Sequence, residues 1–191
     1  MKQCPDLDFE VRWLPYQLNP SASQEPQSRI EAYQKKFGKG IEEVKAMGGF
    51  MKSKFDAVEL PFNFTDKAKI SNTFDAHRVL TAAFKQGGAA AQDKAAEVLF
   101  EAYFAAEKAP NDPEALKKAA AAAGLAENVL DKSFAAEETK EEMKVGQQLS
   151  ARGVLHGVPH FVIRSEDTRV AQISGAEPPE SFVQAFQRVA K

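Results

Sequence analysis

The sequence predicts an α/β fold in which a long helical segment interrupts a sheet-forming core. Strand-like segments lie near both ends of the 191-residue chain, and the region between them has helical periodicity. We therefore predict that residues 1–27 and 154–191 form the core and that residues 28–153 form an inserted helical subdomain.

The first predicted element is a strand over residues 7–14. Phe9, Val11 and Trp13 alternate with charged residues there, which is typical of a strand with one buried face. Pro15 ends this strand, and residues 19–27, with two prolines, are expected to form a loop.

The insert contains helices with recognisable start and stop residues. Ser28 can cap a helix that ends at Gly38. The next helix, over residues 41–55, is expected to bend or break at Gly48 and Gly49. Further helices are predicted from residue 72 or 73 to Gly87-Gly88, at 91–107, from the Asp112-Pro113 start to Gly124, at 127–134 and at 137–152.

The last part of the chain returns to sheet. Residues 160–164 and 169–173 are predicted strands, and the short turn at 165–168 requires them to be antiparallel. Pro159 stands at the entrance of the first of these strands, where its missing N–H removes no ladder hydrogen bond. A closing helix is expected over residues 178–190.

Composition argues against several classes of function. The net charge of −2 does not indicate a nucleic-acid-binding surface, and no apolar run approaches the ~18 residues of a membrane span. The N-terminus has no apolar signal segment. A single cysteine cannot form an internal disulfide, so we expect a cytoplasmic protein, or an organellar one if a transit peptide has been removed. The three histidines lack metal-ligand spacing, so no metal site is predicted.

Four segments, in this order, resemble the DsbA-like thioredoxin-fold family: residues 9–20, 72–78, 157–161 and 174–180. The sequence is most similar to the FrnE-type branch, which is related to 2-hydroxychromene-2-carboxylate isomerase and kappa-class glutathione transferase. The resemblance implies a thioredoxin-like core with an inserted helical subdomain, and thiol–disulfide oxidoreductase chemistry. It also implies that Pro159 is the cis-proline and that the backbone of Val158 pairs with a thiol substrate.

The chain departs from this family at the dithiol. Family members begin with a central strand and a helix that opens with Cys-x-x-Cys, whose leading thiol is activated by the helix N-terminus. This sequence has only eight residues before Phe9 and one cysteine. We therefore expect an incomplete core without the first strand and first helix, and no dithiol activity in this chain. Cys4 is interpreted as a loop cysteine and not as a nucleophile.

The remaining candidate residues allow two interpretations each. His77 matches a family position that faces the active-site cleft, so it contacts substrate or glutathione, or it is a buried histidine bonded to the backbone. His160 could face the same cleft or pack along its strand. Ser174 and Gly175 offer N–H groups that could bind a glutathione carboxylate, and an ordinary turn explains them equally well.

Three functions remain open from the sequence. The chain is a thiol–disulfide oxidoreductase separated from its dithiol, a glutathione-dependent isomerase or transferase, or a non-catalytic binding or assembly module. In the family's sheet the missing strand lies between the strands that resemble residues 8–14 and 160–164, so both would have unpaired edges. We expect a homodimer to cover them, in preference to a strand from another polypeptide or direct pairing of the two.

Overall fold

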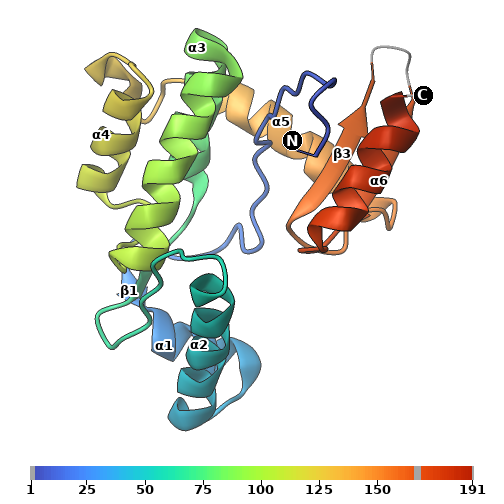
Figure 1. Cartoon of the computed structure of the whole chain (residues 1–191). Helices are drawn as coiled ribbons and strands as arrows, with labels where there is room; N and C mark the ends of the chain where they lie inside the picture. Colours follow the sequence, from blue (N-terminus) through green and yellow to red (C-terminus); the bar gives the residue numbers. More distant parts are fainter. Residues whose placement is uncertain (1–2, 166–168, 191) are drawn as a thin grey trace. The chain divides into compact units, whose positions relative to one another are not determined.

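The computed structural model of the chain describes residues 3–165 and 169–190, which form two compact units (Figure 1). The terminal unit consists of Met1–Val11 and Met143–Lys191, and the helical unit consists of Arg12–Glu142. Helices dominate the chain and the strands are few, so the fold is α/β with a large helical part, as the sequence predicted.

The terminal unit contains a two-stranded antiparallel sheet covered by a helix. Strand β3 (His160–Arg164) pairs with β4 (Val170–Ser174), and Phe161 lies opposite Ile173. Helix α6 (Pro179–Ala190) packs on this sheet through Phe182, whose ring lies 4.8 Å from that of Phe161. Both strands, their antiparallel pairing and the closing helix are confirmed, while residues 166–168 of the predicted turn lie outside the described residues.

The helical unit is built on helices α3 and α4. Val79, Ala83, Ala95, Leu116 and Val129 belong to its buried core. The bounds of its elements are β1 (Gln27–Ser28), α1 (Arg29–Phe37), α2 (Ile41–Asp56), β2 (Lys69–Ile70), α3 (Phe74–Phe100), a π-helical turn (Glu101–Ala105), α4 (Pro113–Ala122), a 3₁₀ turn (Glu127–Leu130) and α5 (Ala136–Ala151), whose last residues belong to the terminal unit.

Most predicted helix ends are confirmed by their caps. The Ser28 hydroxyl accepts a hydrogen bond from the Glu31 N–H, and Asp112 accepts one from the Ala115 N–H at 3.0 Å. Gly38 ends α1 with a positive φ of 64°, and Gly88 kinks α3 where the sequence predicted a break. The predicted helix over residues 127–134 is wrong, because only a short 3₁₀ turn forms there.

The predicted strand over residues 7–14 is also wrong, because this segment forms no strand. The main chain of Trp13 pairs with a side chain instead: its N–H donates to Gln92 Oε1 at 2.8 Å, and Gln92 Nε2 donates to its carbonyl oxygen at 2.9 Å. Phe9 and Trp13 belong to different units, where they contact Phe186 and Phe100 respectively. The alternation of apolar residues therefore reflects two packing sites.

The sequence predicted a bend or a break at Gly48 and Gly49, and the break is wrong because helix α2 runs through both residues. Gly48 is buried against the ring of Phe64, and a Cβ on Gly48 would lie 2.3 Å from Phe64 Cδ1. A Cβ on Gly49 would meet no atom within 4 Å. Gly48 therefore permits close packing of the helix, and Gly49 has no such role.

Alanine at these two neighbouring positions is expected to change stability in opposite directions. Gly49→Ala should raise the free energy of unfolding by about 0.5–1 kcal/mol, because alanine is the better helix former. Gly48→Ala should lower it by about 1–3 kcal/mol, because the added methyl group forces Phe64 to move. Urea unfolding followed by circular dichroism measures both. A stabilising Gly48→Ala substitution would contradict the packing described here.

Candidate functional site

The structure brings five of the predicted site residues together at one end of the β3–β4 sheet. Val158 and Pro159 lead into β3, and the peptide bond between them is cis. His160 lies directly opposite Ser174, and its Nδ1 is 2.8 Å from the Ser174 hydroxyl oxygen. The Gly175 N–H donates to the Pro159 carbonyl oxygen at 2.8 Å, which ties the loop to the end of β4.

This last bond bears on the two interpretations of Ser174 and Gly175. Their N–H groups could bind a carboxylate such as that of glutathione, or they could belong to an ordinary turn. The Gly175 N–H is already used by Pro159, and the Ser174 hydroxyl contacts His160. Gly175 is therefore part of the sheet's own hydrogen bonding, so its main chain is unsuited to hold that carboxylate.

The main-chain groups of β3 alternate between its partner strand and its other side. In an antiparallel pair, successive residues direct their N–H and C=O groups to opposite edges. The Gly175 N–H donates to the Pro159 carbonyl oxygen, and the Ser165 N–H donates to the Arg169 carbonyl oxygen. These two bonds show that the main-chain groups of Pro159, Phe161 and Ile163 point toward β4. Within β3, the main chains of His160, Val162 and Arg164 consequently point to the edge away from β4, called here the outer edge, and Val158 lies in the bend that leads into this strand.

The outer edge of β3 carries no third strand within the described part of the chain. At its beginning, the N–H and C=O of Val158 make no hydrogen bond among the described residues, and 45% of this residue is exposed. The His160 ring adds a polar atom nearby, because its Nε2 is buried without a hydrogen-bond partner in residues 3–165 and 169–190. Val158 and His160 thus keep hydrogen-bonding capacity that the fold does not use.

His77 has a different environment in the first turn of α3, within the helical unit. Burial lowers the pKa of His77 from 6.5 to about 4, and a hydrogen bond to the main chain of Tyr16 raises it only in part. The ring is therefore neutral at pH 7. Of the two interpretations of His77, the structure favours the buried histidine that bonds the backbone.

This pKa predicts that stability falls when the pH is lowered. The unfolded chain binds a proton at His77 below about pH 6.5 and the folded chain only below about pH 4. Between these values the unfolded state binds more protons, so the free energy of unfolding should fall by about 2–3 kcal/mol from pH 7 to pH 4 on account of this residue. Urea unfolding at several pH values should give a flatter profile for His77→Gln. Parallel profiles for the two proteins would show that His77 does not cause the pH dependence.

Comparison with known proteins assigns the family. The DSBA-like thioredoxin domain matches residues 2–187, which is almost the whole chain. The chain belongs to the DsbA-like thioredoxin family. The crystal structure of a "probable DsbA oxidoreductase" from Streptomyces coelicolor superimposes with a TM-score of 0.76 and 26% sequence identity, covering 93% of this chain and 74% of that one. No curated protein matches the sequence. The predicted thioredoxin-like core with a helical insert is thereby confirmed.

Within this DsbA-like chain, the one cysteine belongs to a turn and not to a helix or strand. Cys4 is 7% exposed, and its carbonyl oxygen accepts a bond from the Leu7 N–H in a turn. A buried thiol is poorly placed to attack a substrate disulfide. The 191 residues therefore provide no second thiol and no accessible first one.

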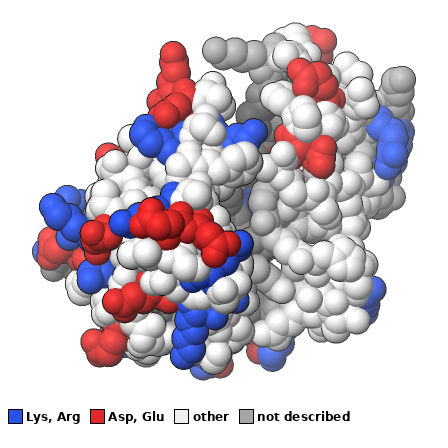
Figure 2. Space-filling model, turned by 90° about the horizontal axis from the view of Figure 1, so that it is seen from below, with Lys and Arg blue, Asp and Glu red and all other residues white. Residues whose placement is uncertain are grey.

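The surface of the chain has no strong charge preference on the face drawn in Figure 2, where acidic and basic side chains lie interspersed. The described residues contain no group of three His, Cys, Asp or Glu side chains that could hold a metal ion. No described helix is both long and apolar enough to cross a bilayer.

Proposed function

We propose that this chain is a FrnE-type member of the DsbA-like family that binds extended thiol- or disulfide-containing peptides at Val158 and the adjoining outer edge of β3. The observation that carries this proposal is the unpaired main chain of Val158. An extended peptide can satisfy these groups as an added strand does, and main-chain pairing of this kind accepts many sequences. A thiol–disulfide oxidoreductase needs this tolerance because its substrates share only their cysteines.

The proposed site supplies binding and not the reacting thiols. Thiol–disulfide exchange requires an attacking thiolate and a second sulfur that resolves the mixed disulfide. Residues 1–191 contain only the buried Cys4. On its own, the chain therefore acts as a peptide-binding module, and any exchange at Val158 uses thiols from outside these residues. The relative from Streptomyces coelicolor, described as an oxidoreductase, supports the class of reaction in which such a module takes part.

Two observations weigh against the glutathione-dependent alternative. The Gly175 N–H is occupied by Pro159, and His77 bonds the main chain of Tyr16. Both residues had been considered as glutathione contacts. Peptide binding at Val158 needs neither of them.

The proposal is tested by titrating the ¹⁵N-labelled chain with an unfolded, cysteine-containing peptide of about ten residues. We expect amide shifts concentrated on Val158, His160 and Val162, because the Val158 N–H is unpaired and the N–H groups of the other two face the outer edge. Val158→Ala keeps the main chain and should bind equally well. The same peptide with N-methyl groups at alternate residues cannot donate main-chain hydrogen bonds to the chain. It should therefore bind at least about tenfold more weakly.

Two outcomes would overturn this function. One is a set of shifts confined to the helical unit, and the other is equal binding of the N-methylated peptide. As an activity control, the chain should reduce insulin disulfides no faster than its Cys4→Ser variant. Turnover that survives Cys4→Ser would place reactive chemistry elsewhere in the chain.

A further inference from the structure

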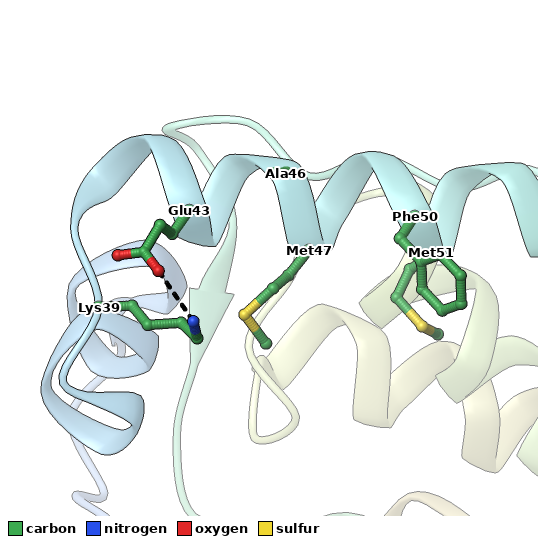
Figure 3. A pocket seen from close by; sticks show the side chains of 6 residues that line it. All are labelled: Lys39, Glu43, Ala46, Met47, Phe50 and Met51. Atoms are coloured by element: carbon green, nitrogen blue, oxygen red, sulfur yellow. Dashed lines mark hydrogen bonds and ion pairs between the residues drawn. The ribbon is translucent and has the colours of Figure 1, made fainter.

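Helix α2 exposes an apolar face that the other elements of the helical unit do not cover. Its buried residues, Val44 and Gly48, lie on one side of the helix. Another side lines an open groove of about 470 Å³, and its lining residues are Lys39, Glu43, Ala46, Met47, Phe50 and Met51 (Figure 3). Phe50 is 63% exposed. A phenylalanine beside two methionines on an exposed helix face is typical of a surface that packs against another helix.

The charges on this face have a definite order along the helix. Glu43, Met47, Phe50 and Lys54 recur at intervals of four, three and four residues, so they form one stripe. The acidic end of the stripe lies near the N-terminus of α2 and the basic end near its C-terminus. Lys39 pairs with Glu43 at 2.9 Å, and the ammonium of Lys54 lies 5.2 Å from the centre of the Phe50 ring.

We propose that a second copy of this chain occupies this face, with the two α2 helices antiparallel about a two-fold axis between Met47 and Phe50. In this arrangement Met47 meets Phe50 of the second copy, and Glu43 meets Lys54 of the second copy. Both contacts occur twice, as two-fold symmetry requires. A parallel pairing would put Glu43 against Glu43 and Lys54 against Lys54, so the charges select the antiparallel arrangement.

The length of the face sets the expected strength of the dimer. The 16 residues of α2 span about 24 Å, at 1.5 Å per residue. Contact along one helix of this length makes a small interface, and small interfaces are typical of weak complexes. We therefore expect a dissociation constant of about 10–100 μM. This interface uses a different surface from the proposed peptide site on β3, so the two proposals can fail independently.

Sedimentation equilibrium of the full chain tests this proposal. The protein concentration should run from about 5 to 500 μM, a range that brackets the expected dissociation constant. The chain should pass from monomer to dimer across the range. Phe50→Glu should remain monomeric throughout. Leu18→Glu is the matched control, because Leu18 is also 63% exposed but lies outside α2, and it should dimerise like the unaltered chain.

A charge exchange tests the antiparallel register. Lys54→Glu places two carboxylates opposite each other and should weaken the dimer about tenfold or more. Adding Glu43→Lys to that variant restores opposite charges and should return the dissociation constant to within about threefold. Circular dichroism verifies that each variant is folded, because Glu43 also accepts a hydrogen bond from the Gly40 N–H.

Three results would overturn the proposal. A monomer at every concentration would exclude the dimer. A dimer that is unaffected by Phe50→Glu would use another surface, such as the outer edge of β3. A dimer that Phe50→Glu abolishes but the double exchange fails to restore would contradict the antiparallel register.

Discussion

Replacing Arg78 with methionine is expected to lower the free energy of unfolding by about 3–5 kcal/mol, the largest single effect we predict. The Arg78 side chain is 1% exposed. Its Nη1 donates to the carbonyl oxygens of Val129 and Asp131 at 2.5 and 2.8 Å, and its Nε lies 3.3 Å from Asp75 Oδ1. The Arg78 side chain therefore links α3 by hydrogen bonds to the segment that follows α4, which contains Val129 and Asp131.

The physical reason is that methionine fills the space but donates no hydrogen bond. Buried carbonyl groups left without a donor cost about 1–3 kcal/mol each, and the Asp75 carboxylate also loses its cation. Urea unfolding should show the loss. Arg188→Met, at an exposed position of α6, is the control and should change stability by less than about 0.5 kcal/mol. A loss below about 1 kcal/mol for Arg78→Met would mean that water replaces the guanidinium at these carbonyls.

The helix ends of this chain could be predicted because their causes are local. Ser28 and Asp112 bond main-chain groups three residues away, and Gly38 adopts the positive φ that ends α1. Such signals are fully contained in a few consecutive residues. The β3–β4 hairpin was predictable for the same reason, since a short connection leaves only antiparallel pairing.

The errors, and the questions that the sequence left open, arise where a distant residue decides the outcome. The residues next to Gly48 in the sequence do not indicate that the ring of Phe64 packs on it. A glycine that permits close packing was therefore interpreted as a helix break. Whether the Gly175 N–H is free depended on Pro159 across the sheet. The surroundings of His77 depended on its burial and on the main chain of Tyr16. Sequence patterns identify the residue type that a site needs but not the groups that surround it.

The strand predicted over residues 7–14 failed for a related reason. Alternation of apolar residues indicates two different faces, but it does not identify what pairs with the main chain. The side-chain amide of Gln92, 79 residues further along, pairs with the main chain of Trp13 in place of a neighbouring strand. The edge that this segment was expected to expose is therefore absent, whereas β3, like its partner β4, keeps one edge without a partner strand in the described chain.

Replacing Gln92 with leucine is accordingly expected to lower the free energy of unfolding by about 3–4 kcal/mol. Gln92 is fully buried and joins three main-chain groups, because its Nε2 also donates to the Leu80 carbonyl oxygen at 3.1 Å. Leucine has a similar volume, so the loss comes from the unpaired main-chain groups and not from a cavity. Asp93→Ala is the neighbouring control: Asp93 accepts a solvent-exposed hydrogen bond from the Trp13 indole N–H at 3.2 Å, and the loss of this bond should cost less than about 1 kcal/mol.

Hydrogen exchange of the Trp13 amide separates this explanation from a general loss of packing. In the unaltered chain this N–H is bonded to Gln92 Oε1, so it should exchange only when the segment detaches from α3. In Gln92→Leu it should exchange at least about a hundredfold faster, since about 3 kcal/mol of local protection is lost. Amides in the core of α3, such as that of Val79, should accelerate only in proportion to the global loss of stability. If the Trp13 and Val79 amides accelerate equally, Gln92 stabilises the helical unit as a whole and does not act as a specific partner of residue 13.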